Sequence, residues 1–299
     1  MSGAARGGPA GAGPGGGGPA GAGPGGGGPA GAGPAGRHPA DLALEALRAS
    51  HGDSRPAVTS LTVDEAILLD QIGYDPVDLL TGASVVQVAT FAGFGVGYSD
   101  NGELGQLSGA LEASRERALD RLTESASHAG ADGVVGVALD VGDLSRGGRL
   151  VHLVATGTGV RRRGSGGAGG RPFSAALTGQ EVHLLERAGY QPLGIVTGVC
   201  AYHVGHQAFG QWASSVRTNQ EMTVYTEALY DARELAMTRL QDRALALAAD
   251  GVVGARIDER SGVWGTHVIE FSAIGTALRS VGGEHRPLDP KLVIDLTSR

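Results

Sequence analysis

The sequence is poor in cysteine, in aromatic residues and in long apolar runs, and each shortage excludes a class of protein. Cys200 is the single cysteine, which excludes an intramolecular disulfide or a site built from several thiolates and suits a reducing compartment. Aromatic residues make up 4% of the chain, so small aliphatic side chains must form the core. No apolar run approaches the roughly 18 residues of a membrane span, and the N-terminus lacks the apolar core of a signal peptide. We therefore expect a cytoplasmic protein without a membrane partner.

Basic residues and catalytic motifs are also scarce. Lys and Arg number 24 against 31 Asp and Glu, which gives a formal net charge of −7. A nucleic-acid partner is not expected, because nucleic-acid-binding proteins normally carry a basic footprint. The sequence contains no G-x-S-x-G, H-E-x-x-H or C-x-x-C motif and no paired catalytic carboxylates, so we do not expect an enzyme.

Glycine and proline are abundant instead, and their excess lies in the first 36 positions. The ten-residue unit P-A-G-A-G-P-G-G-G-G begins at Pro9 and starts again at Pro19 and Pro29. Side chains no larger than alanine cannot offset the entropy lost on ordering, so residues 1–39 are predicted to be a disordered, low-complexity tail. Residues 40–57 contain a short stretch of apolar periodicity and are predicted to form a docking helix and a linker.

The rest of the sequence contains an internal duplication. The six residues from Ala131 to Gly136 recur unchanged from Ala249 to Gly254, at an offset of 118. The earlier pairs Gly-Tyr and Thr-Gly recur at an offset of 116, as Gly73-Tyr74 with Gly189-Tyr190 and Thr81-Gly82 with Thr197-Gly198. Conserved order and spacing indicate two homologous domains. We place them at 58–163 and 172–281, joined by a Gly-rich linker at 164–171 and followed by a tail or edge strand at 282–299.

Each copy has the same predicted pattern of elements. A capping box, Thr62 with Glu65 or Thr178 with Glu181, opens a short helix that ends at the Gly-Tyr pair. A β-branched strand and a long helix follow, and Gly130 ends this helix in the first copy whereas the second runs to Ala248. Two further strands complete the unit, at 134–141 and 150–160 in the first copy and at 252–258 and 267–278 in the second. Arg161–Arg163 and the glycines after them are expected to be flexible. The fold class is therefore α+β, a β-α-β-β unit with a leading helix.

The combination of these motifs resembles the YbjQ-like family, whose members are labelled heavy-metal-binding domains. It comprises the Thr-Gly strand, an Arg-Glu pair in the long helix, the Ala-Asp-Gly-Val-Val-Gly segment and a final Gly-Thr strand. The Arg-Glu pairs are Arg115-Glu116 and Arg233-Glu234, and the Gly-Thr pairs are Gly157-Thr158 and Gly275-Thr276. The resemblance implies two tandem dodecin-like domains that form a ring-shaped homo-oligomer, a pentamer in family members.

Cys200, His203 and His206 form the one cluster of cysteine and histidine, and they are the candidate metal ligands. These residue types suit Zn²⁺, Cu or Ni. On a regular strand Cys200 and His203 point to opposite faces, whereas Cys200 and His206 share a face but lie about 20 Å apart. A bulge, or convergence of histidines around a ring axis, would be needed to bring them together.

Other candidate residues have simpler interpretations. His152 is expected on a strand face or at a subunit contact. Asp132 and Asp250 are expected to accept backbone N–H groups near the turn from helix to strand. Arg115 and Arg233 are expected on the helix surface, in intrahelical or inter-subunit ion pairs.

These observations predict a non-enzymatic, oligomeric binding module. The ligand would be a transition metal, as the family label suggests. The alternatives are an oligomeric scaffold or protein-interaction protein without a metal, and a binder of a small ligand between subunits. In each case the expected partner is the protein itself.

Overall fold

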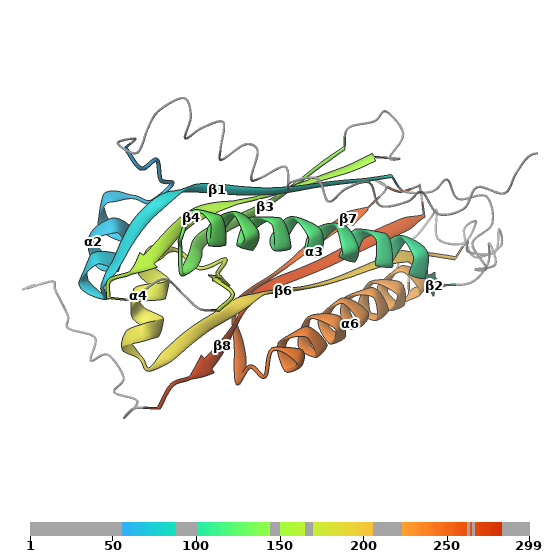
Figure 1. Ribbon diagram of the computed structural model, residues 1–299. Coiled ribbons are helices and arrows are strands. Elements are labelled where there is room, and N and C mark those ends of the chain that lie inside the picture. Colours follow the sequence, from blue (N-terminus) through green and yellow to red (C-terminus); the bar gives the residue numbers. More distant parts are fainter. Residues whose placement is uncertain are drawn as a thin grey trace, which may run out of the picture. The chain divides into compact units, whose positions relative to one another are not determined.

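The computed structural model describes residues 56–87, 101–143, 150–164, 170–205, 223–261, 264 and 267–282, and these form two α+β copies (Figure 1). The predicted tail, nearly all of the docking helix and linker, and the end of the chain from 283 lie outside the described residues. The elements of copy 1 are α2 (Val63–Gln71), β1 (Tyr74–Gln87), β2 (Gly102–Glu103), α3 (Gly105–His128), β3 (Gly133–Asp143) and β4 (Leu150–Arg162). Those of copy 2 are β5 (Phe173–Ser174), α4 (Gly179–Arg187), β6 (Tyr190–His203), α6 (Thr223–Ala246), β7 (Gly251–Ser261) and β8 (Val268–Ser280).

The predicted capping boxes are present at both short helices. Before α2, the backbone N–H of Thr62 donates to Glu65 Oε2 at 2.7 Å, and the N–H of Glu65 donates to Thr62 Oγ1. Thr178 and Glu181 repeat this arrangement before α4. Each box satisfies backbone N–H groups that the first helical turn leaves without intrahelical partners.

The strands form two four-stranded sheets, each built from three long antiparallel strands of one copy and a short strand of the other segment. The strand orders are β1-β4-β3-β5 and β2-β6-β8-β7. β5 precedes α4 of copy 2 but pairs in parallel with β3 of copy 1, and β2 belongs to copy 1 but pairs with the end of β6. The two copies therefore exchange short strands.

The repeated glycines are explained by close packing and by bulges. A Cβ atom at Gly82 would lie 2.2 Å from the backbone oxygen of Ala118 in α3, and one at Gly198 would lie 2.0 Å from that of Ala236 in α6. The Thr-Gly motif thus lets each long helix cross its strand in direct backbone contact. Gly136 and Gly254 adopt positive φ values of 64° and 61° beside a register shift in β3 and β7, where glycine is favoured.

Several predicted boundaries differ from the structure, and β3 and β7 each extend beyond the predicted strand at both ends. The first long strand of each copy begins directly at Tyr74 or Tyr190, because the following proline lies at an edge of its sheet beside a bulge. Arg161 and Arg162 were expected to be flexible but end β4, where the Arg161 side chain donates to the carbonyls of Gly130 and Ala129. The second long helix ends at Ala246, two residues earlier than predicted.

The largest buried cluster of apolar side chains joins the two copies. Leu107 and Leu111 of α3 pack with Val199 and Ala201 of β6, as well as with strands of copy 1. In Figure 1, α3 accordingly runs between the first sheet and β6, while α6 lies on β6 and β8. None of the helices in the described parts of the chain is long and apolar enough to cross a membrane.

Candidate functional site

Two of the three candidate metal ligands, Cys200 and His203, lie at the end of β6. Cys200 is buried and faces Phe271 of β8 in the register, whereas His203 is half-buried opposite Val268. Side chains alternate along this strand, so Cys200 and His203 lie on opposite faces. The ring of His203 lies 6.5 Å, centroid to centroid, from that of His267. His206 lies outside the described residues. Within the described ranges, no three His, Cys, Asp or Glu side chains are placed to hold a metal ion.

The environment of Cys200 keeps its thiol protonated. Burial, and then the negative charge of Glu103, raise the pKa of Cys200 to about 12, although Arg239 and Ser108 act in the opposite direction. A cysteine binds a metal as a thiolate, so a raised pKa makes Cys200 a poor ligand at neutral pH.

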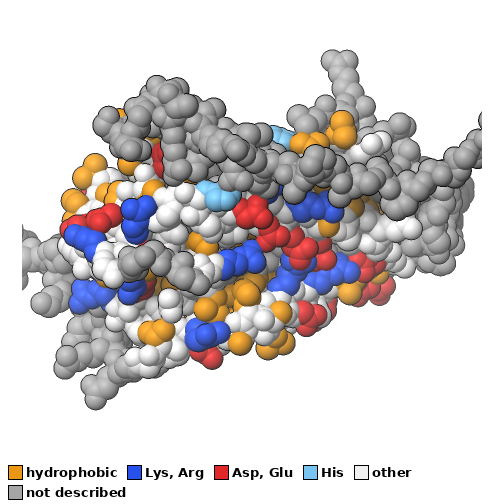
Figure 2. All heavy atoms as spheres, viewed as in Figure 1, with side chains coloured by type: hydrophobic (Ala, Val, Ile, Leu, Met, Phe, Trp, Pro, Cys, Tyr) orange, Lys and Arg blue, Asp and Glu red, His pale blue; other side chains and the backbone are white. Residues whose placement is uncertain are grey.

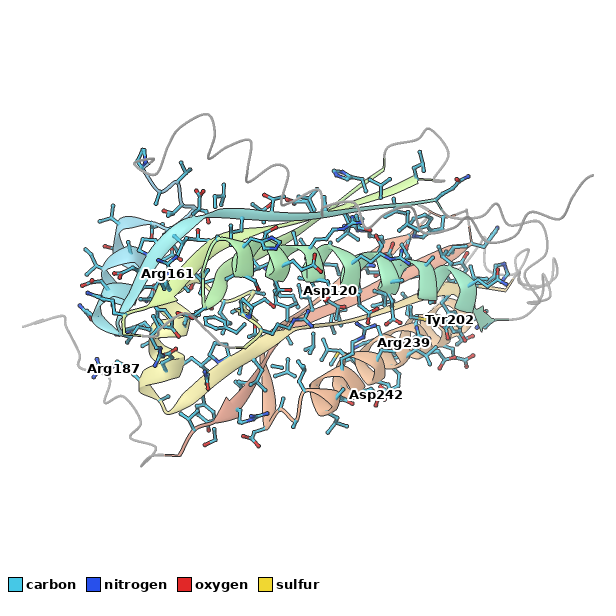
Figure 3. All side chains as sticks on the ribbon, in the orientation of Figure 1. Asp120, Arg161, Arg187, Tyr202, Arg239 and Asp242 are labelled. Atoms are coloured by element: carbon cyan, nitrogen blue, oxygen red, sulfur yellow. The ribbon has the colours of Figure 1, made fainter. Side chains whose placement is uncertain are left out.

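The same end of β6 is where β2 and the start of α3 contact copy 2. The N–H of Leu104 donates to the carbonyl of Ala201 at 2.8 Å, and the N–H of Ala201 donates to Ser108 Oγ at 2.9 Å. Arg239 of α6 pairs with Glu103 of β2 at 2.6 Å and donates to the carbonyl of Val199. Figure 3 shows Arg239 beside Tyr202 at this end. The polar groups here thus join the two copies.

A buried ion pair also crosses this junction. Arg115 of α3 and Glu270 of β8 are 4% and 1% exposed, and Arg115 Nη2 lies 2.9 Å from Glu270 Oε1. Trp264 Nε1 donates to the other carboxylate oxygen at 2.7 Å. The surface position predicted for Arg115 is therefore wrong, because its carboxylate partner comes from the other copy. Such a pair is stable only because further hydrogen bonds satisfy the carboxylate.

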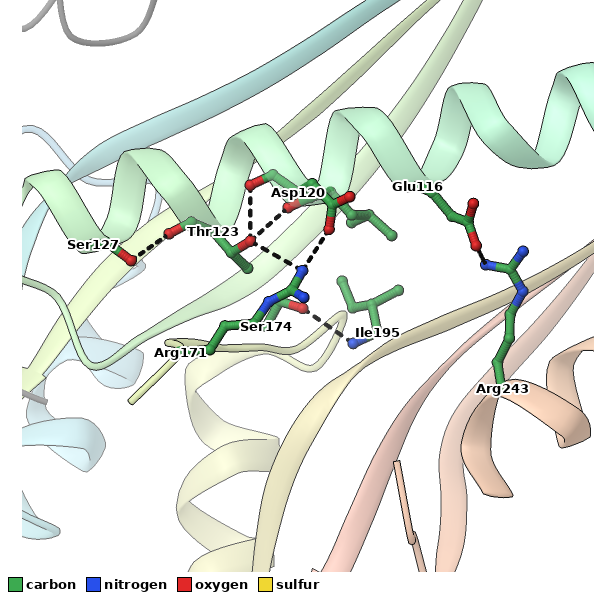
Figure 4. Close-up of polar contacts among 9 residues, drawn as sticks. Glu116, Asp120, Thr123, Ser127, Arg171, Ser174, Ile195 and Arg243 are labelled. Atoms are coloured by element: carbon green, nitrogen blue, oxygen red, sulfur yellow. Dashed lines mark hydrogen bonds and ion pairs between the residues drawn. The ribbon is translucent and has the colours of Figure 1, made fainter. Parts of the chain in front are cut away.

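The two long helices are joined at their facing sides. Arg243 of α6 lies 2.6 Å from Glu116 of α3 (Figure 4). It also lies 3.7 Å from Glu112 of the same helix. The space-filling view shows acidic and basic side chains interspersed over this region (Figure 2). Partly exposed pairs of this kind contribute little individually, but they fix the alignment of the two helices.

A cavity of about 340 Å³ lies where the linker enters copy 2. It is lined on one side by Tyr74, Asp132 and Arg162, and on the other by Arg171, Phe173 and Pro192. Burial, and then the hydrogen bond to Glu186, raise the pKa of Tyr74, which donates to Glu186 Oε1 at 2.7 Å. Arg162 also pairs with Glu186, and Arg171 pairs with Asp120 on α3. The polar side chains that line the cavity are thus already engaged in hydrogen bonds or ion pairs.

The two duplicated aspartates accept backbone N–H groups as predicted, but from a neighbouring strand rather than within the turn from helix to strand. Asp132 Oδ2 accepts the backbone N–H of Arg162, and Asp250 Oδ2 accepts that of Ser280, both at 2.7 Å. The donors lie on the neighbouring strands β4 and β8. Each carboxylate therefore ties the end of a long helix to the last strand of its copy.

Sequence reasoning missed several residues of the junction. They are Glu103, Arg239, Arg243, Trp264 and Glu270. The available signal was divergence between the copies, because Glu270 corresponds to His152, and Glu112 to Tyr230, at the offset of 118. This signal would have found only part of the junction, because Arg239 matches Arg121 and does not differ between the copies.

Comparison with known proteins agrees with this architecture. The YbjQ family model, described as "Putative heavy-metal-binding", matches twice, at residues 76–163 and 181–281. The chain belongs to this family and carries two of its domains in tandem. Over 256 residues it is 36% identical to the encapsulin nanocompartment protein Rv1762c of Mycobacterium tuberculosis, covering 84% of this chain and 95% of that protein.

Shorter relatives match about one domain. A UPF0145 protein of Psychrobacter arcticus is 36% identical over 98 residues, which is 32% of this chain and 60% of the relative. A UPF0145 protein of Vibrio campbellii is 38% identical over 88 residues, covering 29% of this chain and 81% of the relative. The mycobacterial protein thus shares the tandem arrangement, whereas these two match over less than a third of the chain.

Proposed function

We propose that this protein is a non-enzymatic, self-associating scaffold component of an encapsulin-type protein nanocompartment in the cytoplasm. The relative named as a nanocompartment protein supports the proposal, because the similarity covers nearly its whole length. The ring-shaped homo-oligomer implied by the family resemblance belongs to the same proposal.

One structural observation carries the scaffold role. The charged side chains gathered between the copies bind one another, in the pairs Arg115–Glu270, Arg239–Glu103 and Arg243–Glu116. Groups that are paired and packed in this way stabilise a joint between domains rather than presenting acids, bases or nucleophiles to a substrate. The surface with the most ion pairs is therefore a contact between the two copies within this chain.

Co-expression with an encapsulin shell protein tests this function. Assembled shells would be isolated on a density gradient, and the chain should be retained with them at a fixed ratio. An unrelated protein of similar mass, co-expressed in its place, should remain at the top of the gradient. A chain that stays at the top together with the unrelated protein would contradict the scaffold role.

Metal binding is the second candidate function. The family description and the adjacent rings of His203 and His267 favour it. In this proposal His203 and His206, with or without Cys200, would hold Zn²⁺, Cu or Ni.

Elemental analysis of protein purified without a metal-affinity tag tests this candidate. After incubation with each ion and removal of the excess, a fixed ratio of metal to chain should be found. The ratio should fall toward zero in the His203→Ala/His206→Ala variant and stay unchanged in His128→Ala, which alters an exposed histidine on α3. Equal metal content in all three proteins would contradict a site at these residues.

A further inference from the structure

The chain contains one complete joint between two YbjQ copies, and this joint has a direction. Copy 1 contributes the outer side of α3, the edge of β3 and one side of α2. Copy 2 contributes the outer face of β6, the helix α4 and the segment 173–177. At the edge of β3, the N–H of Ala175 donates to the carbonyl of Val134 and the N–H of Gly136 donates to that of Leu177, each at 2.8 Å. We call the surface used by copy 1 the back and the surface used by copy 2 the front.

Because the joint is head-to-tail, each copy has one surface that the joint does not use. Copy 1 retains a front, formed by residues 57–61, the outer side of α2 and the outer face of β1. Copy 2 retains a back, formed by the outer side of α6 and the edge of β7, which ends its sheet. Each unused surface has a counterpart in the other copy that is in contact inside the chain. Comparing the two copies position by position therefore indicates what the unused surface would contact.

Burial differs between the copies at the positions of the front. Val58, Ile67 and Val85 are 50%, 52% and 55% exposed, whereas their counterparts in copy 2, at an offset of 116, are 5% exposed or less. These counterparts are Ser174, His183 and Ala201. Val63, also exposed, matches the buried Gly179. Exposed large apolar residues thus lie where copy 2 is covered by copy 1.

The positions of the back show the same difference. Arg115 and Leu111 of α3 are buried, whereas the matching Arg233 of α6 is exposed and Leu229 is half-buried. A Cβ atom at Gly133 would lie 2.1 Å from the ring of Phe173. At the matching Gly251, the nearest atom to such a Cβ would be Leu278 Cδ1 of β8, at 3.8 Å. Among the described residues no strand pairs with this edge of β7, which leaves room there for another strand.

We propose that a second copy of this chain binds here, with its front on the back of copy 2, in a repeat of the internal joint. Residues 57–58 of the second copy add in parallel to Gly251–Val252 of β7, as β5 adds to β3. By the same correspondence its Thr59 N–H donates to the carbonyl of Val252, and α6 covers the outer face of its β1. This deepens the self-association in the proposed function and rests on it.

Repetition of a head-to-tail contact closes into a ring when the rotation allows, and otherwise gives a filament. Each chain adds both of its copies to the same ring, so copies 1 and 2 alternate and their number is even. A ring of five copies, the arrangement implied by the family resemblance, is therefore not available to whole chains of this protein.

One contact in the chain-to-chain joint differs from the internal joint. Arg115 meets Glu270 inside the chain, but the equivalent pair between chains is Arg233 with His152, since His152 matches Glu270 in the register. Replacing His152 with glutamate would recreate the buried Arg–Glu pair between chains.

Native mass spectrometry and sedimentation of the full chain over a concentration series test this inference. The wild-type protein should form assemblies of several 30.1 kDa chains. Val85→Arg and Ile67→Lys should each shift it to single chains, with unchanged circular dichroism, because both side chains are about half exposed within the chain. Thr59→Pro, at a half-buried position, removes the N–H that would add to β7 and should shift the protein to single chains as well. Leu245→Lys is the matched control, since Leu245 is exposed and its counterpart Ser127 is exposed as well.

His152→Glu tests whether the joint between chains can be strengthened. It should tighten assembly by about tenfold, as close charge pairs at interfaces do, and Arg233→Met should remove this gain. In class averages from electron microscopy, the number of lobes should be twice the order of the rotation axis, because each chain contributes two different copies to the ring.

A wild-type chain that stays single at all concentrations, or assemblies that resist all three front variants, would overturn the inference. Class averages in which the number of lobes equals the order of the rotation axis would also overturn it. If assembly follows these variants but the chain is not retained with shells, the nanocompartment role alone fails.

Discussion

At the residue scale, Ala248 has a backbone conformation that alanine tolerates poorly. Its φ is 52°, and the matching residue after the first long helix is Gly130, with φ of 69°. Ala248→Gly should therefore raise the free energy of unfolding by about 0.5–1 kcal/mol, because the left-handed region costs a residue with a Cβ about 1–2 kcal/mol and the flexible glycine returns part of it.

Chemical denaturation measures this change. Gly130→Ala is the reciprocal control and should lower stability, since its Cβ would also lie 2.8 Å from Arg161 Nη2. Equal stability of Ala248→Gly and the wild type would contradict the assignment of strain to this position.

Cys200 gives a second prediction at this scale. Burial raises the pKa of its thiol to about 12, so the folded protein should react with a disulfide reagent at neutral pH far more slowly than the unfolded protein. Both rates are measured from the absorbance of the thiolate that the reagent releases when it reacts with Cys200. Rapid labelling of the folded protein would show that the end of β6 opens readily.

At the scale of the element, His183 of α4 makes stability depend on pH. It is 5% exposed, its Nδ1 has no hydrogen-bond partner among the described residues, and burial, followed by the charge of Arg187, lowers its pKa. The unfolded chain therefore binds a proton more readily than the folded chain. Stability from this group is present above about pH 6.5 and is lost as the pH falls toward and through the lower folded-state pKa.

Denaturation at several pH values tests this role. In His183→Gln, the fall of unfolding free energy between about pH 7 and pH 5 should be shallower than in the wild type, by up to about 1.4 kcal/mol per pH unit. Leu245→Gln, which changes an exposed side chain that does not titrate, should keep the wild-type slope. A wild-type slope in His183→Gln would show that this histidine is not the group that titrates.

The ion pair between α3 and β8 gives another prediction at the scale of elements. Arg115→Met leaves the Glu270 carboxylate buried without its cation and should cost about 3–5 kcal/mol of unfolding free energy. Arg115→Met/Glu270→Met should recover most of that loss, because both charges are then absent. Arg117→Met, an exposed change on the same helix, should stay within about 0.5 kcal/mol of the wild type. Equal losses in the single and double variants would contradict the pairing.

The elements themselves were predictable from the sequence to different degrees. Thr62 with Glu65, and Thr178 with Glu181, predicted two helix starts because a capping box is a local pattern, and both are confirmed. β2 and β5 were not predicted, since two residues carry no periodicity and their partners lie in the other copy. Arg115 was misplaced on the surface for a related reason, because its carboxylate partner is 155 positions away.

At the scale of the whole molecule, the shared core predicts that the copies stay together without the peptide link. A protease site inserted between Gly166 and Gly167 and then cleaved should yield two pieces that co-migrate under native conditions. The reason is that α3 packs against Val199 and Ala201, and β5 stays paired with β3. Gel filtration of the cleaved protein checks this, with the same sample in denaturant as the control. Separation of the pieces under native conditions would show that the linker holds the copies together.

The exchange of β2 and β5 also has a consequence for the order of events on the ribosome. Copy 1 is made first, but β2 meets β6 only after roughly 100 further residues, which takes about 5–20 s at ordinary rates of synthesis. During that interval the apolar side of α3 that carries Leu107 and Leu111 has no β6 to cover it. On one messenger RNA, a chain whose synthesis is further advanced could then bind its β6 to the exposed side of α3 in a neighbouring nascent chain. Either the nascent chains are kept apart during synthesis, or some of them form domain-swapped pairs in which the β6 of one chain covers the α3 of another.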